Sequence, residues 1–232
     1  YARRRDARIG QALPLRLTAG LAAQPVDAVR KSDGQPYTVF TPFSRAWLSL
    51  PAPGRPLPAP EHLPAFSDRQ IASLPLDALL GLPFAGEPAR LFPPGEGEAQ
   101  RRLAAFLGSA IYSYHEERNR MDLEGTSGLS PYLRFGMISA RQAAWAARTA
   151  IERAPDALAR QGASIWLNEL IWREFYLAIL YHFPHVRRMS FRPTMRSVRW
   201  RNDPGHFATW CEGRTGYPVV DAAMRQLNQT GW

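Results

Sequence analysis

The sequence predicts a mainly α-helical protein, and three observations support this fold class. From Glu98 onward, apolar residues recur at the three- and four-residue spacing of an amphipathic helix, as in Leu103, Phe106, Leu107, Ala110, Ile111 and Tyr114. Strand signals are nearly absent after residue 40. Residues 51–94 hold eleven of the 21 prolines and show little periodicity, which is typical of a linker draped over a surface.

The region before this linker contains short elements. A basic amphipathic helix followed by a short strand is expected within residues 1–20, and another short element over 27–32. A further helix should run through Trp47 to Leu50, with Thr41 as its N-cap and Pro42 as its first helical residue. The linker itself should contain at most a short helix around residues 75–80.

Caps and glycines divide the region after the linker into several helices. The expected elements are a helix that Ser139 caps and that runs to about Glu152, an aromatic-rich helix over 163–183, a short helix over 204–211 that Gly213 and Gly216 end, and a last helix over 219–229 that Pro218 starts and Gly231 caps. No internal repeat is visible.

The composition points to a compact basic protein. The 232 residues are 45% hydrophobic and 21% charged, which supports a buried core and argues against general disorder. The net charge of +9 favours a polyanionic partner, with nucleic acid the first candidate. Lys31 is the only lysine, however, so an arginine-rich composition explains the charge equally well.

Cysteine use and hydropathy indicate a reducing, intracellular setting. Cys211 is the only cysteine, so the sequence contains neither a disulfide framework nor a cysteine-rich metal site. Polar residues interrupt the apolar stretch over 163–183, so no membrane span is expected. The first residues include neither Met nor an apolar signal core, and we expect the chain to be an internal piece of a longer protein.

The residues Trp166-Leu-Asn-Glu-Leu-Ile-Trp-Arg-Glu-Phe-Tyr176 are the most informative stretch. At 100° per residue, one helical face carries a carboxylate, an indole, a guanidinium and a phenol, those of Glu169, Trp172, Arg173 and Tyr176. This combination is typical of a pocket lining. The alternative is that Glu169 and Arg173 form an ion pair at i,i+4 spacing while the aromatic residues fill the core.

The segment Gly125-Thr-Ser-Gly-Leu-Ser-Pro131 lies between two expected helices. Ser130 is a suitable N-cap and Pro131 a suitable first helical residue. Hydroxyls and backbone N–H groups at a helix start could bind an anion such as a cofactor pyrophosphate, or the segment is a plain capped turn. No Gly-Lys-Ser/Thr sequence occurs, which argues against a P-loop NTPase.

Three segments together resemble the DNA photolyase/cryptochrome family, most closely its class I cyclobutane pyrimidine dimer photolyases. Residues 124–136 resemble the segment that binds the flavin phosphates, residues 166–175 the helix that lines the flavin and lesion cavity, and residues 212–232 the next signature of the family. The resemblance implies that residues 1–50 are the end of an α/β antenna domain, 51–97 an interdomain linker, and 98–232 the first half of the helical FAD-binding domain.

The resemblance also implies roles for individual residues. FAD would be bound by Tyr114, Thr126, Ser127, Gly128, Leu129, Ser130, Trp166, Glu169 and Arg173. Gly128 departs from the Arg or Lys that many relatives have there. Glu169 would share a hydrogen bond with a pyrimidine dimer, Trp172 would stack on the flipped dimer, and Arg118 would contact a DNA phosphate. Trp200 would be the outermost member of the tryptophan chain that photoreduces the flavin.

The function implied by the resemblance is light-driven repair of pyrimidine dimers in DNA by electron transfer from excited reduced FAD. A folate or deazaflavin antenna is possible in the full-length protein. The expected setting is the bacterial cytoplasm, as a monomer without metal or membrane, associated with the nucleoid when bound to DNA. A cryptochrome photoreceptor, a (6-4) photolyase and a flavin-free helical nucleic-acid binder are the alternatives, and we expect this piece alone to be inactive.

An arginine-rich stretch over residues 185–202 has two interpretations. It contains no acidic residue and six arginines, at positions 187, 188, 192, 196, 199 and 201. With Phe191 and Trp200 interleaved, this pattern is typical of a nucleic-acid surface. In the related family the stretch faces the antenna domain, which favours a solvated or interdomain face. His115, His182, His185 and His206 lack metal-ligand spacing and are expected to be structural.

Overall fold

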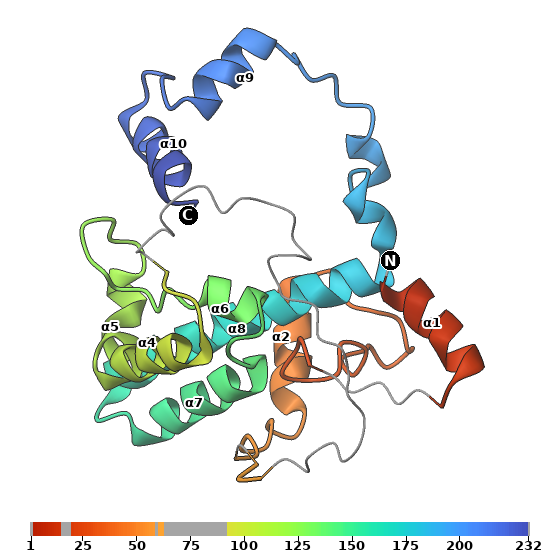
Figure 1. Ribbon diagram of the computed structural model, residues 1–232, viewed down its shortest axis with the longest axis vertical. Coiled ribbons are helices and arrows are strands. Elements are labelled where there is room, and N and C mark those ends of the chain that lie inside the picture. The colour runs from red at the N-terminus through yellow and green to blue at the C-terminus, as the bar shows by residue number, and fades with distance from the viewer. Residues whose placement is uncertain (1, 15–19, 59, 63–91, 232) are drawn as a thin grey trace, which may run out of the picture. The chain divides into compact units, whose positions relative to one another are not determined.

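The computed structural model describes residues 2–14, 20–58, 60–62 and 92–231 (Figure 1). The chain forms two compact units. The first comprises Tyr1–Pro56 together with Gly95–Arg196, and the second comprises Leu57–Pro94 together with Ser197–Trp232. The described residues contain helices and one isolated bridge, Arg30 with Pro36, so the mainly α fold class is confirmed. The predicted domain limits at residues 50 and 97 stay a prediction.

Helices make up the first unit. Their bounds are α1 (Ala2–Ala12), α2 (Phe40–Ser49), α4 (Glu96–Gly108), α5 (Ala110–Glu117), α6 (Ser130–Arg134), α7 (Ala140–Arg153) and α8 (Ala157–His182), followed by two short 3₁₀ turns, Pro184–Arg187 and Pro193–Met195. The 26-residue α8 contacts α2, α5 and α7 (Figure 1). It is therefore the helix around which the core of this unit is built.

Small residues allow the neighbouring helices to approach α8 closely. A Cβ atom at Gly162 would lie only 2.4 Å from the carbonyl oxygen of Tyr112 in α5, so only glycine fits at this crossing. On α7 the packed face is made of alanines, including Ala143, Ala144 and Ala147, each 0% exposed. The close approach brings α5 and its C-terminal end next to the middle of α8.

The single amphipathic helix expected through Tyr114 is wrong, because Ser109 interrupts it. Ser109 has φ −153° and ψ −56°, which ends α4 and starts α5 in a new direction. Gly108 and Ser109 are both weak helix formers, so the break occurs where helix propensity is lowest. The apolar residues keep their expected burial: Phe106 is buried in α4, and Ile111 and Tyr114 are buried in α5.

The starts of α2 and α8 differ from the predicted ones. Helix α2 begins at Phe40 with Val39 as N-cap and no side-chain cap, so Thr41 does not cap it and Pro42 lies later in its first turn. A proline is tolerated there because the first N–H groups of a helix have no internal partner. Helix α8 begins earlier than predicted, at Ala157, where the Asp156 side chain accepts a hydrogen bond from the Ala159 amide at 2.8 Å.

Other expectations are confirmed. The Ser139 side chain caps α7 by accepting a hydrogen bond from the Gln142 amide, and the basic N-terminal helix is present as α1. The strand expected after α1 and the short helix around residues 75–80 lie outside the described residues. No helix in the part of the chain that the structure describes is long and apolar enough to cross a membrane.

The second unit contains α9 (Pro204–Cys211) and α10 (Pro218–Thr230), close to the predicted bounds. Gly231 caps α10 in the left-handed conformation, with φ +74°. The buried Asp221 holds the turn between the helices, because it accepts hydrogen bonds from the Thr215 amide at 2.7 Å, the Thr215 hydroxyl at 2.6 Å and the Gly216 amide at 3.0 Å. The Thr215 hydroxyl is the main cause that lowers the pKa of Asp221.

Candidate functional site

The face of α8 that carries Glu169, Trp172, Arg173 and Tyr176 is open to solvent rather than packed into the core. Tyr176 is 62% exposed, and the other three side chains are partly exposed. Core filling by these aromatic residues, one of the two interpretations of the sequence, is therefore wrong for Tyr176. We call this surface the open face of α8. Its mixture of charged and aromatic groups is available to a ligand.

Glu169 forms an ion pair with Arg118, which follows the end of α5. The Arg118 Nη1 atom donates to Glu169 Oε1 at 2.7 Å. The Arg118 guanidinium also lies over the Tyr114 ring, 5.4 Å from its centroid. The predicted DNA contact and the predicted lesion contact are thus neighbours. Both side chains are about one-third exposed, so this is a pair at the surface and not one closed in the core.

Arg173 does not pair with Glu169, so the i,i+4 ion pair, the alternative interpretation of the sequence, is wrong. Its Nη1 atom donates to the carbonyl oxygen of Leu21 at 2.6 Å, and its Nη2 atom donates to that of Leu133 in α6 at 3.4 Å. Nη1 also lies 3.7 Å from the carboxylate of Glu174. Arg173 therefore ties α8 to two other segments. One of them is α6, the helix that follows the turn over residues 125–130.

Glu174 is an anchoring residue to which sequence reasoning assigned no role. It is only 6% exposed, and its carboxylate accepts hydrogen bonds from the Ala23 amide at 3.0 and 3.1 Å and from the Gln24 amide at 3.2 Å. Burial raises the pKa of Glu174, and the two amides oppose that rise. Its position beside Leu170 on the apolar side of the helix was the available signal, because a carboxylate there needs partners.

Trp172 belongs to a cluster of aromatic rings between α2 and α8. The Phe40 ring lies parallel to the indole, with 3.5 Å between ring centroids and 5° between planes. Phe175 contacts the indole edge-on at 5.9 Å, and Tyr176 lies at 5.7 Å with 22° between planes. The indole therefore has a fixed orientation on the open face.

Tyr114 and Trp166 are buried behind the Arg118–Glu169 pair. Phe106 joins them, with its ring centroid 5.8 Å from that of Tyr114 and 5.1 Å from that of Trp166. Tyr114 is 8% exposed and Trp166 is 4% exposed, and burial raises the pKa of the Tyr114 phenol. These two predicted cofactor contacts thus form an aromatic wall that presents only a small accessible surface.

The turn over residues 125–130 packs tightly against the end of α5. A Cβ atom at Gly125 would lie 2.4 Å from the Cβ atom of Glu117, and Leu129 is 2% exposed. Gly128 has φ +58°, a left-handed conformation that favours glycine over residues with a Cβ atom. The predicted N-cap is wrong by one residue, because α6 starts at Ser130 and Leu129 precedes it without a side-chain cap.

The hydroxyls of this turn are available to a ligand. Within the described part of the chain, the side chains of Thr126, Ser127 and Ser130 make no hydrogen bond. Thr126 and Ser127 border a surface hollow of about 280 Å³, whose other lining residues are Arg101, Arg102, Ala105, Phe106, Ala110 and Glu124. Free hydroxyls next to guanidinium groups are suited to an anionic group such as phosphate.

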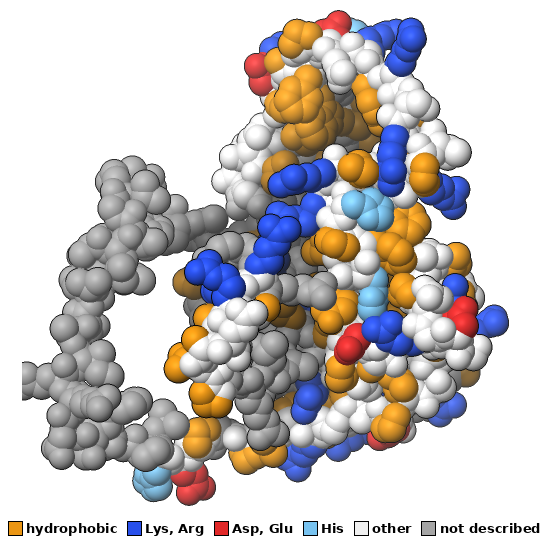
Figure 2. Space-filling model, turned by 90° about the vertical axis from the view of Figure 1, so that its right-hand side faces the viewer, with side chains coloured by type: hydrophobic (Ala, Val, Ile, Leu, Met, Phe, Trp, Pro, Cys, Tyr) orange, Lys and Arg blue, Asp and Glu red, His pale blue; other side chains and the backbone are white. Residues whose placement is uncertain are grey.

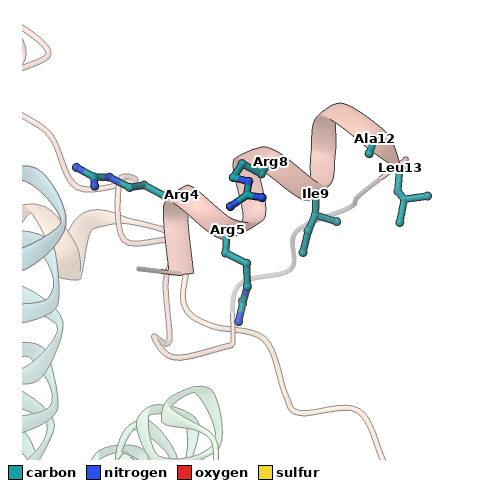
Figure 3. A pocket seen from close by; sticks show the side chains of 6 residues that line it. All are labelled: Arg4, Arg5, Arg8, Ile9, Ala12 and Leu13. Carbon is teal, nitrogen blue, oxygen red and sulfur yellow. The ribbon is translucent and has the colours of Figure 1, made fainter.

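Glu98 restrains the two arginines of this hollow. Arg101 and Arg102 each donate to its carboxylate at 2.7 Å, and these bonds lower the pKa of Glu98 to about 2. A larger hollow of about 570 Å³ runs along α1, with Arg4, Arg5, Arg8, Ile9, Ala12 and Leu13 along it (Figure 3). None of the predicted site residues lines it, so we do not place the site there.

Basic side chains are spread over the face shown in Figure 2, with few acidic ones among them. Four arginines of the arginine-rich stretch lie after α8 in the first unit, and all are exposed: Arg187, Arg188, Arg192 and Arg196. Trp200 lies in the second unit and is 74% exposed. Its predicted role in electron transfer stays a prediction.

Comparisons with protein families and with curated proteins agree with each other. Residues 166–232 match the family described as the FAD binding domain of DNA photolyase. The whole chain is 39% identical to a deoxyribodipyrimidine photo-lyase of Synechococcus and 41% identical to one of Thermus thermophilus, covering 50% of each. The chain therefore spans about half the length of these curated relatives.

Solved structures give the same result. A bacterial class III photolyase from Agrobacterium tumefaciens matches 92% of this chain with a TM-score of 0.77 and 31% identity, and the match covers 44% of that protein. An archaeal photolyase from Sulfolobus tokodaii, described with two FAD molecules, matches 69% of the chain and 32% of its own at a TM-score of 0.52 and 33% identity. A Synechocystis cryptochrome shares the fold at 23% identity and a TM-score of 0.63, with 92% of this chain and 45% of its own covered.

Proposed function

Because the chain belongs to the DNA photolyase/cryptochrome family, we propose that it is part of a light-driven DNA repair enzyme. The proposed reaction is the splitting of cyclobutane pyrimidine dimers, as in the relatives named deoxyribodipyrimidine photo-lyase. One observation supports repair most directly. The open face of α8 presents a partly exposed indole, Trp172, one turn from the carboxylate of Glu169. Fold alone could not decide between repair and other functions.

FAD is the proposed cofactor, and the residues present fit parts of it. The free hydroxyls of Thr126, Ser127 and Ser130, with the backbone at Gly128 and Leu129, would hold the phosphates and ribityl chain. Tyr114, Trp166, Glu169 and Arg173 would lie near the ring system. When bound, reduced FAD supplies the electron that enters the dimer after light absorption and that returns after the ring has split.

Residues of this chain would recognise the dimer and contact the DNA backbone. Trp172 would stack on the flipped dimer, and such stacking contributes about 1–3 kcal/mol per base. A dimer costs less to flip out of the duplex than an intact pair, which favours the lesion. Glu169 would exchange a hydrogen bond with the dimer and needs a proton to act as donor. Arg118, paired with Glu169 at 2.7 Å, would contact a DNA phosphate.

Further proposals concern the partners and the setting of the intact protein. DNA that contains pyrimidine dimers would be the substrate, bound by a monomer in the cytoplasm and at the nucleoid. Trp200 would be the outermost member of the tryptophan chain for photoreduction, a role that suits a side chain 74% exposed. A folate or deazaflavin antenna would belong to the intact protein.

Two alternatives keep the same fold. A cryptochrome would use flavin photochemistry for signalling, but a partly exposed indole beside a carboxyl group serves a base contact better than a sensor. A (6-4) photolyase would act on a different lesion. Both predict that the protein fails to repair cyclobutane dimers, and this difference makes the alternatives testable.

The decisive experiment uses the full-length protein with FAD. A dimer-containing oligonucleotide is incubated with it in blue light, and restored thymines are measured by chromatography. We expect repair in light and none in the dark, with a large loss of dimer binding in Trp172→Ala. Absence of repair by the light-exposed wild type would reject the proposed function.

A further inference from the structure

The Phe40 ring lies flat against Trp172, the residue proposed to stack on the lesion. The two ring centroids are 3.5 Å apart and the planes differ by 5°. A base inserted between two rings needs about 3.5 Å on each side, or ~7 Å in total. No base can therefore enter between Phe40 and Trp172. Any base that stacks on the indole has to use the surface that Phe40 leaves uncovered, next to the Tyr176 ring, which lies 5.7 Å from the indole with 22° between planes.

Contacts between α2 and α8 fix the position of Phe40. Phe40 is the first residue of α2, and its ring also meets Phe175 edge-on at 5.8 Å. Phe43, one turn further along α2, contacts the same Phe175 ring at 5.2 Å. Phe43 and Phe175 are 2% and 6% exposed, so the base of this cluster belongs to the buried core.

A polar contact locks the same two helices together. The Ser44 hydroxyl donates to Asn168 Oδ1 at 3.1 Å, and Ser44 is 8% exposed. Helix α2 therefore cannot slide along α8 without breaking a mostly buried hydrogen bond. The Phe40 ring is a rigid support for the indole rather than a mobile cover.

We propose that Phe40 is a positioning residue for lesion recognition, because it covers one face of the Trp172 indole and holds the other surface ready for the dimer. This inference rests on the proposed function, in which Trp172 stacks on the dimer. A partly exposed indole without this support could rotate about its side-chain bonds, and ordering it again would weaken binding. Phe40 would thus act through Trp172 without touching DNA.

The test measures equilibrium binding of the full-length, FAD-containing protein to two oligonucleotides in the dark, one with a dimer and one undamaged. In Phe40→Ala we expect dimer affinity to fall about three- to tenfold, the range expected from loss of one aromatic pair. Affinity for undamaged DNA and the flavin absorption spectrum should not change. Phe40→Tyr keeps a flat ring and should restore dimer affinity.

Two further variants separate positioning from general stability. Phe40→Leu keeps an apolar side chain over Phe175 but lacks the flat ring, so it should weaken dimer binding while the protein stays folded. In a Trp172→Ala background, Phe40→Ala should cause no further loss of dimer affinity, because its effect passes through the indole.

Several outcomes would overturn the inference. Unchanged or tighter dimer binding in Phe40→Ala and Phe40→Leu would do so, and tighter binding would mean that Phe40 blocks the indole. Phe40→Ala could lower dimer affinity as much in the Trp172→Ala background as it does in the wild type. That result would show that Phe40 acts independently of Trp172. If the wild type repairs dimers and Trp172→Ala weakens binding while Phe40→Ala and Phe40→Leu do not, the proposed function stands and this inference fails. If the wild type repairs no dimers in light, the proposed function itself fails.

Discussion

The two sides of α8 each carry a glutamate, and the two residues have opposite surroundings. Glu174 lies on the buried side, where its carboxylate accepts hydrogen bonds from the backbone amides of Ala23 and Gln24. Glu169 lies five residues earlier on the open face, where its partner is the side chain of Arg118. The exposure differs accordingly, with 6% for the Glu174 side chain and 34% for that of Glu169.

This difference separates an architectural role from a recognition role. Backbone amides cannot move away from Glu174 without displacing the chain that carries them. The Glu174 carboxylate therefore stabilises the fold and is not available to a ligand. An arginine side chain can rotate, and Glu169 can therefore exchange Arg118 for a ligand at small cost, because a partly exposed ion pair contributes about 0–1 kcal/mol. The same residue type serves two purposes because its partners differ in mobility.

The largest expected effect is on stability when the buried glutamate is removed. Glu174→Ala should lower the free energy of unfolding by about 3 kcal/mol, because two amides and Arg173 lose their buried partner. Glu174→Gln should cost less, since its amide oxygen still accepts a hydrogen bond. Urea unfolding of the full-length protein measures both changes. Glu152→Ala, at an exposed position of α7, is the control and should change stability by less than about 0.5 kcal/mol.

If Glu174→Ala lowers the free energy of unfolding no more than the control Glu152→Ala does, Glu174 has no architectural role. The comparison would then rest on Glu169 alone.

The second prediction concerns the close crossing of α5 and α8, the two helices that bring Arg118 and Glu169 together. Gly162→Ala puts a methyl group 2.4 Å from the Tyr112 carbonyl oxygen, so the helices must move apart at a cost of about 1–3 kcal/mol. Gly97→Ala in α4 meets no atom within 4 Å and should stabilise the helix slightly. Thermal unfolding measures the midpoint temperature of both variants. Equal shifts of the midpoint in the two variants would contradict the prediction.

The third prediction concerns Glu169. Glu169→Ala should weaken dimer binding about tenfold, equivalent to ~1.4 kcal/mol, while stability changes little. Glu169→Gln keeps an N–H donor without needing a proton and should bind dimers better than Glu169→Ala does. Binding titrations with dimer-containing and undamaged oligonucleotides measure the difference. Equal losses in the two variants would indicate that the ionised carboxylate, and not a donated hydrogen bond, is what the lesion requires.

The smallest expected effect is a pH dependence of stability. Burial raises the pKa of Glu174 above its ordinary value of 4.5, so the folded state holds this proton more tightly than the unfolded state. The contribution of Glu174 is therefore largest below pH 4.5 and is lost as the pH rises through the folded pKa. Glu174→Gln should flatten this part of a stability–pH profile.

Asp221 should give stability the opposite dependence on pH. Its pKa lies below the ordinary 3.8, so its contribution is present above pH 3.8 and is lost as the pH falls through the folded value. Asp221→Asn should flatten only the acidic end of the profile. A Glu174→Gln profile that keeps the wild-type slope above pH 4.5 would assign that slope to another group.

Much of the local structure was predictable because it depends on neighbours in the chain. The cap at Ser139, the start of α9 at Pro204 and the left-handed Gly231 at the end of α10 all follow from short-range geometry. The errors have local causes as well. Ser109 breaks a helix whose apolar pattern runs on without interruption, and the pattern alone does not contain that break.

The partners of the charged residues on α8 were not predictable. One of the two interpretations of the sequence paired Glu169 with Arg173, four residues away, because that spacing places both on one face. The structure pairs Glu169 with Arg118, 51 residues away, and gives Arg173 two backbone carbonyls instead. Short spacing makes a pair possible, but the arrangement of neighbouring segments decides which of several partners is used.

The sequence by itself determined the helical character, the caps at Ser139 and Gly231 and the set of residues from which the candidate site is built, because apolar periodicity and cap chemistry act within a few residues. Only the tertiary structure decided which glutamate anchors the fold, which one stays accessible, and that Phe40 supports Trp172. Those choices depend on contacts between segments far apart in the chain, such as Ala23 and Glu174, which are 151 residues apart. Such contacts form when helices pack, and no local pattern specifies them.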